Sequence, residues 1–140
     1  MTKLSFPKII NLPKINDVRG NLSFFENNNY LPFQIKRTYW IYDVPGGEKR
    51  GGHAFKEQDE FIIALSGSLD VIIDDGKKTS KFSLNRSYFG LYIPCGYWRN
   101  MQNFSTNSVV LVVSNTDYNP KDYIRNKTDF INYFNSNENR

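Results

Sequence analysis

Proton-transfer chemistry in this sequence depends on His53, its single histidine. An imidazole is the side chain whose ordinary pKa best suits taking up a proton near neutral pH. Gly51 and Gly52 come immediately before it, and residues without side chains let a ligand approach the backbone closely. We therefore interpret His53 as the candidate general base of a ligand site. A hydrogen-bonded core or surface histidine is the alternative.

Two arginines and a glutamate accompany this histidine. Arg50 precedes it by three residues, and Arg99 follows later in the chain. A guanidinium buried without a partner is costly, so two cations in one small site predict an anion, either a diphosphate or an enolate formed during a reaction. A surface ion pair is the alternative for Arg50. Glu60 is predicted to pair with an arginine or to orient His53.

Two tyrosines are candidates for a second proton-transfer group. Tyr39 and Tyr92 lie in segments predicted as strands beside the proposed site, and a phenol is able to donate or relay a proton. Packing in the core or at the rim is the alternative for both. The candidate catalytic residues are therefore His53, Tyr39, Tyr92 and Glu60.

The spacing of these residues resembles the two motifs of the cupin superfamily. The first motif has a glycine, two histidines, a glutamate and a glycine where this sequence has Gly47, His53, Phe55, Glu60 and Gly67. The second has a proline, a glycine, a histidine and an asparagine where this sequence has Pro94, Gly96, Arg99 and Asn103. A phenyl ring cannot coordinate a metal and a guanidinium repels a cation, so we expect no metal. The first ligand position of such a barrel points into its mouth, where folds of this kind hold small ligands.

The elements that must position these residues are mostly strands. Short β-branched and aromatic runs recur at the spacing of a sandwich or barrel, at 37–44, 60–65, 69–73, 81–84, 88–93, 98–104 and 108–114. Apolar residues at helical spacing predict one helix over about 120–134, capped by Asn119 or Asp117. We expect one all-β domain over 1–140, a cupin jelly-roll β-barrel over about 15–116 with a short C-terminal α-helix.

Composition narrows the functional classes. Eighteen lysines and arginines against 14 acidic residues give a net charge of +4, which fits an anionic ligand. The basic residues are scattered, which argues against nucleic-acid binding. The single cysteine, Cys95, excludes an internal disulfide or a cysteine-based zinc site. No apolar run is long enough for a membrane span or a signal peptide, so we expect a cytoplasmic protein without a membrane partner.

Over residues 17–134 the sequence resembles the sugar-nucleotide 3,4-ketoisomerases. The resemblance rests on the ordered segments DVRGNLSFFE, PFQIKRTYW, RGGHAFK, LSGSLDVIIDDG, LNRSYFGLYIPCGYWRNMQNFSTNSVVLV and DYIRNKTDF. It implies that dTDP-4-keto-6-deoxyglucose is isomerised through an enediol, without a metal or redox cofactor, and that the product serves the synthesis of 3-amino-3,6-dideoxy sugars for surface glycans. It also implies a homodimer.

The resemblance assigns roles to individual residues. It implies that His53 is the base, that Arg50 contacts the substrate, and that Arg19 reaches nucleotide phosphates, often across a dimer interface. The expected substrate-binding residues are Arg50, Arg99, Arg19, Gly52 and Phe55. Many relatives have a second histidine where this chain has Phe55, so His53 shuttles both protons, or a tyrosine, Glu60 or water supplies the second. A deoxysugar 3,5-epimerase and a non-catalytic dTDP-sugar-binding cupin are the alternatives.

Overall fold

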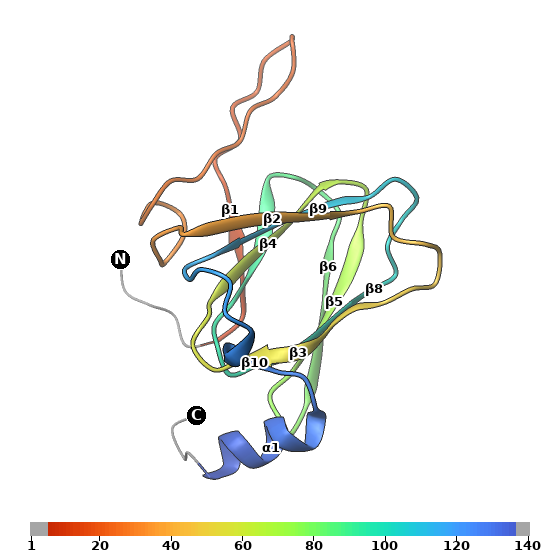
Figure 1. The fold of residues 1–140 in the computed structure, drawn as a ribbon. Helices are drawn as coiled ribbons and strands as arrows, with labels where there is room; N and C mark the ends of the chain where they lie inside the picture. Colours follow the sequence, from red (N-terminus) through yellow and green to blue (C-terminus); the bar gives the residue numbers. More distant parts are fainter. Residues whose placement is uncertain (1–5, 137–140) are drawn as a thin grey trace.

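Residues 6–136, which the computed structural model describes, fold almost entirely as antiparallel β-sheet (Figure 1). The strands are β1 (Lys8–Asn11), β2 (Arg37–Tyr42), β3 (Arg50–Phe55), β4 (Glu60–Ser66), β5 (Leu69–Asp74), β6 (Thr79–Leu84), β7 (Phe89–Ile93), β8 (Trp98–Gln102), β9 (Val109–Ser114) and β10 (Tyr123–Ile124). A 3₁₀ helix at Pro120–Asp122 and the helix α1 (Lys127–Ser136) complete the described elements. None of the helices described is long and apolar enough to cross a membrane.

The strands form two five-stranded sheets that face each other as a jelly-roll barrel. One sheet has the order β1-β7-β4-β9-β2, and the other has the order β10-β3-β8-β5-β6. The chain changes sheets between β2 and β3 and again between β3 and β4, so strands from both sheets can contribute to one interior site. This architecture confirms the predicted all-β cupin barrel with a short C-terminal helix.

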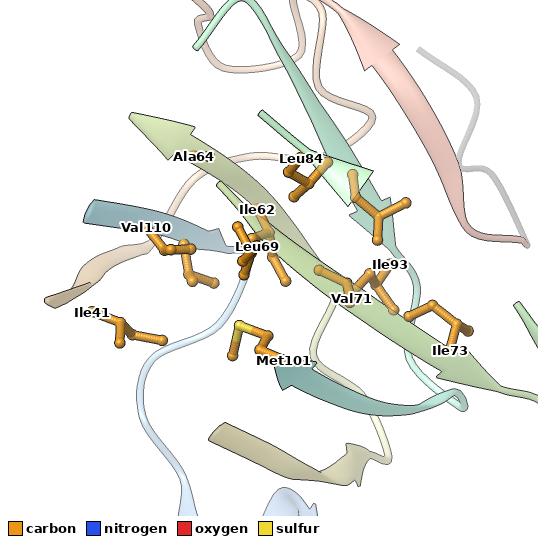
Figure 2. Packing of buried hydrophobic residues seen from close by; sticks show 12 residues of the cluster. Ile41, Ile62, Ala64, Leu69, Val71, Ile73, Leu84, Ile93, Met101 and Val110 are labelled. Carbon is orange, nitrogen blue, oxygen red and sulfur yellow. The ribbon is translucent and has the colours of Figure 1, made fainter. Parts of the chain in front are cut away.

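Strand alternation directs one set of apolar side chains between the sheets (Figure 2). On β4 the inward residues are Ile62 and Ala64, and on β5 they include Val71 and Ile73. Burial of this apolar surface supplies the main driving force for closing the barrel. Met101 of β8 belongs to the same cluster and also lines the cavity described below, so the core forms part of the cavity wall.

The segment between β1 and β2 first leaves the barrel and then returns to cover the outer face of the first sheet. Leu31 and Phe33 pack against Phe61 and Tyr92 in a second apolar cluster on that face. Residues 15–30, which we call the arm, extend away from the barrel (Figure 1). The bridge between Ile15 and Leu22 is part of the arm's own pairing.

The seven predicted strands are all present, each within two residues of its expected ends. Three further strands, β1, β3 and β10, were not among them. The two glycines of β3 obscure its pattern, and β1 and β10 have only four and two residues. Because β1 pairs with β7, the first sheet begins at residue 8, before the expected start of the barrel near residue 15.

The predicted helix over 120–134 is only partly correct. Asn119 does cap a turn, since its side chain accepts a hydrogen bond from the Lys121 N–H, but that turn is a short 3₁₀ helix. The Asp122 carboxylate then accepts hydrogen bonds from the backbone N–H groups of Glu57 and Gln58 at 2.8 and 3.0 Å. These bonds hold the chain against β3, where β10 pairs with it. The α-helix therefore begins only at Lys127.

Candidate active site

A glycine bulge in β3 places Arg50 and His53 on the same face of the strand. Residues three apart on a regular strand point to opposite faces. Here Arg50 pairs with Met101 and His53 pairs with Arg99, so the register shifts by one residue between Gly51 and His53. Met101 and Arg99 are two residues apart on β8 and share a face, and the extra residue in β3 brings Arg50 and His53 opposite them.

Both glycines of this bulge have positive φ angles, 90° at Gly51 and 70° at Gly52, a region that disfavours residues with a Cβ. A Cβ on Gly51 would also lie 3.0 Å from the Arg99 carbonyl oxygen. We expect Gly51→Ala to destabilise the fold by about 1–3 kcal/mol and to reduce catalysis at least tenfold by turning His53 away. Thermal unfolding and turnover of the proposed substrate are the measurements.

Gly46→Ala is the matched control for this substitution. Gly46 lies in the turn before β3, no atom would lie within 4 Å of its Cβ, and its φ is not positive. Both its stability and its turnover should stay close to those of the unmodified protein. Equal effects of the two alanines would show that the bulge does not set the position of His53.

A cavity of about 460 Å³ opens between β2, β3 and the C-terminal segment. It is lined by Arg37, Tyr39, Ile41, Lys49, Arg50, Gly51, His53, Met101, Tyr123 and Arg125. Four of these residues are cationic, and no carboxylate is among the described residues that line the cavity. Such a concentration of one charge sign attracts an anion and raises its local concentration.

His53 lies in the wall of this cavity and is 9% exposed. Burial, together with the positive charge of Arg99, lowers the pKa of His53 to about 3. The nearby Gly51 backbone raises the pKa of His53 in part. Neither ring nitrogen makes a hydrogen bond of good geometry with a partner among residues 6–136. His53 is therefore a neutral imidazole at neutral pH, with one ring nitrogen available as a proton acceptor and the other as a hydrogen-bond donor.

Glu60 is the centre of a buried polar network behind the cavity. Its carboxylate accepts hydrogen bonds from Arg99 Nη1 at 2.6 Å, Gln58 Nε2 at 2.7 Å and the Tyr39 hydroxyl at 2.9 Å. The Arg99 and Glu60 side chains are 0% and 2% exposed. The prediction that Glu60 pairs with an arginine is thus confirmed, and the anion beside Arg99 is a carboxylate of the same chain.

Tyr39 links this network to the cavity, because it lines the cavity and donates its hydroxyl proton to Glu60. Burial and the negative charge of Glu60 raise the pKa of Tyr39 well above its ordinary value. The phenol therefore stays protonated at neutral pH. It can hydrogen-bond to a ligand oxygen or pass a proton on, but it does not act as a base.

The structure brings His53, Arg50 and Tyr39 to one cavity and places the other predicted site residues elsewhere. Arg99 and Glu60 lie behind the wall, so Arg99 is positioned to act on His53 through its charge. Phe55 is fully buried, between the rings of His53 and Tyr123 and the Arg99 guanidinium. Gly52 supports the bulge. Arg19 lies on the arm with its side chain 87% exposed, paired with Asp17.

The predicted position of Tyr92 beside the cavity is wrong. Its neighbours on β7, Leu91 and Ile93, point into the main core, so alternation turns Tyr92 to the outer face of the sheet. There it is fully buried against Phe33 and the second apolar cluster. Tyr92 therefore has no access to the cavity.

Four cavity residues with polar side chains were not among the predicted site residues: Arg37, Lys49, Tyr123 and Arg125. Arg37 shares a face of β2 with Tyr39, two residues away, so alternation along that strand would have found it. Tyr123 and Arg125 were assigned to a helix, and only their extended conformation beside β3 points them into the site. Among residues 6–136, no three His, Cys, Asp or Glu side chains gather as a metal site would require.

The fold and this cavity together define a cupin-type barrel whose site has a histidine and a group of cations in the mouth. The comparisons with known proteins agree with that class. The chain belongs to the FdtA family (WxcM-like, C-terminal), whose profile matches residues 6–135. This membership confirms the resemblance to the sugar-nucleotide 3,4-ketoisomerases.

Several relatives are similar over nearly their whole length. The TDP-4-oxo-6-deoxy-α-D-glucose-3,4-oxoisomerase of Aneurinibacillus thermoaerophilus is 40% identical over 126 residues, 90% of this chain and 91% of that protein. The TDP-quinovose 3,4-ketoisomerase of Campylobacter jejuni is 43% identical, with a TM-score of 0.87 over 92% of this chain and 99% of that one. The 3,4-ketoisomerase QdtA of Thermoanaerobacterium thermosaccharolyticum, solved in complex with TDP, is 32% identical, with a TM-score of 0.92 over 96% and 98%.

A dTDP-4-dehydrorhamnose 3,5-epimerase of Bacillus anthracis is a more distant structural match. It is 17% identical, with a TM-score of 0.73 over 84% of this chain and 76% of that one. At this level of identity the likeness extends to the barrel fold alone. The epimerase alternative therefore has much weaker support than the ketoisomerase.

Proposed function

We propose that this protein is a 3,4-ketoisomerase that converts TDP-4-keto-6-deoxyglucose into a TDP-3-keto-6-deoxyhexose. The observation that carries this proposal is a neutral histidine in the wall of a cationic cavity, in a chain that belongs to this family. A proton-transfer isomerisation of an anionic nucleotide sugar needs these two features. The ketone of the product is the substrate of an aminotransferase, which suits the synthesis of 3-amino-3,6-dideoxy sugars for surface glycans.

The reaction moves one hydrogen between carbons and one between oxygens. His53 removes the proton from C3, and the C–H electron pair forms a C3–C4 double bond as the C4 carbonyl becomes an enolate. Protonation at O4 gives the enediol. The O3–H proton then leaves, the C3 carbonyl forms, and the double bond takes a proton at C4. His53 is the proposed base for C3 and the proposed acid for C4.

The contacts around His53 favour this single-base route. Phe55 has no group able to carry a proton, and the Glu60 carboxylate is occupied by Arg99, Gln58 and Tyr39. We assign the oxygen-bound proton to a different carrier, either the Tyr39 hydroxyl, which lines the cavity, or water. The arginines of the cavity wall, Arg50 among them, are assigned to the diphosphate or the enolate.

Isotope transfer tests this function. We expect incubation with TDP-4-keto-6-deoxyglucose to give a 3-keto product whose C4 hydrogen comes from heavy water, or from C3 when the substrate is deuterated there. NMR of the product locates the label and gives the configuration at C4. Label at C3 and C5 without movement of the ketone would identify an epimerase. A binder without activity would raise the melting temperature with ligand and exchange nothing.

We further propose a homodimer in which the arm of one copy reaches the cavity of the other. The arm exposes Val18 fully and Leu22 to 55%, and the outer face of β2 exposes Trp40 and Tyr42 to about 60%. Apolar surface of this kind is typical of an interface. Arg19, at the arm's turn, would then add a cation to the phosphate site of the partner.

Arg19→Ala should weaken TDP binding about tenfold or more, as expected for the loss of one charge-assisted hydrogen bond, without changing the dimer. Titration calorimetry and sedimentation velocity measure the two effects. Arg86→Ala, an exposed arginine outside the cavity lining, should leave TDP affinity unchanged. A monomer in solution, or equal affinities of the two variants, would refute this role of the arm.

We also propose that the enzyme works in the cytoplasm. Its single cysteine, Cys95, suits a reducing compartment. Fractionation of cells that make the native protein tests this location.

A further inference from the structure

His53 is held in place by aromatic rings. A catalytic histidine is commonly oriented by a hydrogen bond from one of its ring nitrogens to a carboxylate or a carbonyl. Neither nitrogen of His53 makes a hydrogen bond of good geometry with a partner among residues 6–136, although the Gly51 backbone is close enough to raise its pKa. Its ring centroid instead lies 4.8 Å from that of Phe55, at an interplanar angle of 74°, and 5.0 Å from that of Tyr123, at 55°.

The strand register explains why these three rings meet. Phe55 follows His53 by two residues and lies on the same face of β3. Tyr123 pairs directly with Phe55 across the β3–β10 ladder, so it is diagonal to His53 and within reach of a large side chain. The rings of Phe55 and Tyr123 also contact each other, 4.6 Å apart at 65°. Edge-to-face contacts of this kind are favourable and directional.

We propose that Phe55 and Tyr123 form a ring clamp that fixes the orientation of His53 while leaving both of its nitrogens free. They are positioning residues for the proton transfer, and this role rests on the proposed function. Phe55, which occupies the position of a metal ligand in the cupin motif, would then orient the catalytic base. A ring without hydrogen-bonding atoms can pack against an imidazole and compete for neither nitrogen.

The clamp also lies against a buried charge. The Arg99 guanidinium carbon lies 4.9 Å from the centroid of the Phe55 ring, and Arg99 is the cross-strand partner of His53. The charged groups around His53 are Arg99 on β8, Arg50 on β3 and Arg125 after β10, while Tyr39 on β2 and Lys49 line the same cavity. The charges of the arginines and of Lys49 are positive and disfavour a protonated imidazole, whereas Tyr39 is neutral and the Glu60 carboxylate is paired with Arg99. Removing either clamp ring should admit water, lower the cost of protonating the imidazole and so raise the pKa of His53.

The single histidine makes a direct test possible. In tag-free protein, the imidazole carbon–proton signal belongs to His53 alone. We expect no titration of this signal between pH 5 and 8 in the unmodified protein. Phe55→Leu and Tyr123→Leu should each move the midpoint upward by at least one pH unit, whereas Tyr123→Phe should not, because it keeps the ring. Phe61→Leu, a buried phenylalanine in the other cluster, controls for a general loss of packing.

Steady-state kcat and KM of the variants are the second measurement. Phe55→Leu should lower kcat at least tenfold, because the ring that orients His53 is lost. KM should stay within about twofold, because Phe55 does not line the cavity. If Phe55→Leu and Tyr123→Leu both keep the unmodified titration, or if Phe55→Leu keeps the unmodified kcat, the ring clamp is wrong. If no sugar is isomerised but the titrations shift as expected, the proposed function fails and the clamp stands. Because the two variants lie on different strands, the test remains valid if one of them misfolds.

Discussion

Replacing His53 with asparagine should lower kcat for the 3,4-isomerisation by about 10³-fold, the size of effect typical for loss of a general base. Asparagine keeps a polar side chain of similar size but has no group that can accept a proton near neutral pH. Steady-state turnover of TDP-4-keto-6-deoxyglucose, followed by NMR of the product, measures the effect. TDP affinity should stay within a few-fold, since the cations of the cavity remain. Intact turnover would show that another group is the base.

The same residue determines the acid side of the pH profile. Because burial holds the pKa of His53 near 3, the imidazole is already neutral at pH 5, and kcat/KM should show no loss from its protonation between pH 8 and pH 5. An exposed histidine with an ordinary pKa near 6.5 would lose most of its activity over that range. A pKa between 6 and 7 in the pH dependence of kcat/KM, with no matching pKa in the pH dependence of TDP binding, would contradict this prediction.

Folding stability should depend on pH in the corresponding direction. Between about pH 6.5 and 3 the unfolded chain binds a proton at this histidine and the folded chain does not. The free energy of unfolding therefore falls as the pH falls through that window, by up to about 1.4 kcal/mol per pH unit. His53→Asn removes this dependence. Urea unfolding of both proteins at pH 7 and pH 5 compares the two slopes.

Replacing Arg99 with methionine should destabilise the protein by about 3–5 kcal/mol, because it leaves the buried Glu60 carboxylate without its cation. For a chain of this size the melting temperature should fall on the order of 10 °C or more. Differential scanning calorimetry measures this loss.

The double variant Arg99→Met with Glu60→Gln is the decisive control. It removes both charges and keeps an amide oxygen that can accept the hydrogen bond from Tyr39. Stability should recover most of the way, because a buried pair replaced by neutral groups costs much less than an unpaired charge. If the double variant is as unstable as the sum of the two single variants, the ion pair is not the source of the loss.

The strands and the position of His53 could be predicted because local patterns determine them. Runs of β-branched, aromatic and other apolar residues between turn signals reveal β2, β4 and β5 directly, and the motif spacing points His53 toward the barrel mouth. Glu60 was expected to meet an arginine because buried charges need partners. These inferences rest on periodicity and charge balance, which a single sequence displays.

The other site residues depend on contacts between distant segments. Tyr123 and Arg125 lie in a segment whose apolar residues have helical spacing, but the hydrogen bonds from Glu57 and Gln58 to Asp122 and the pairing of β10 hold this segment against β3. Tyr92 was misplaced because its side of the sheet depends on one residue of register. Arg99 faces Glu60 because the two sheets close on each other, which the local sequence around either residue does not reveal.

The pairing of β10 with β3 also has a consequence for biosynthesis. Tyr123 and Arg125, which complete the cavity wall, follow every other cavity residue in the sequence and leave the ribosome after them. Until then the edge of β3 that carries His53 is unpaired, and an open strand edge can pair with other chains. A nascent or truncated polypeptide that ends before Asp122 should therefore be inactive and prone to aggregate, because it lacks β10 and the residues that complete the cavity.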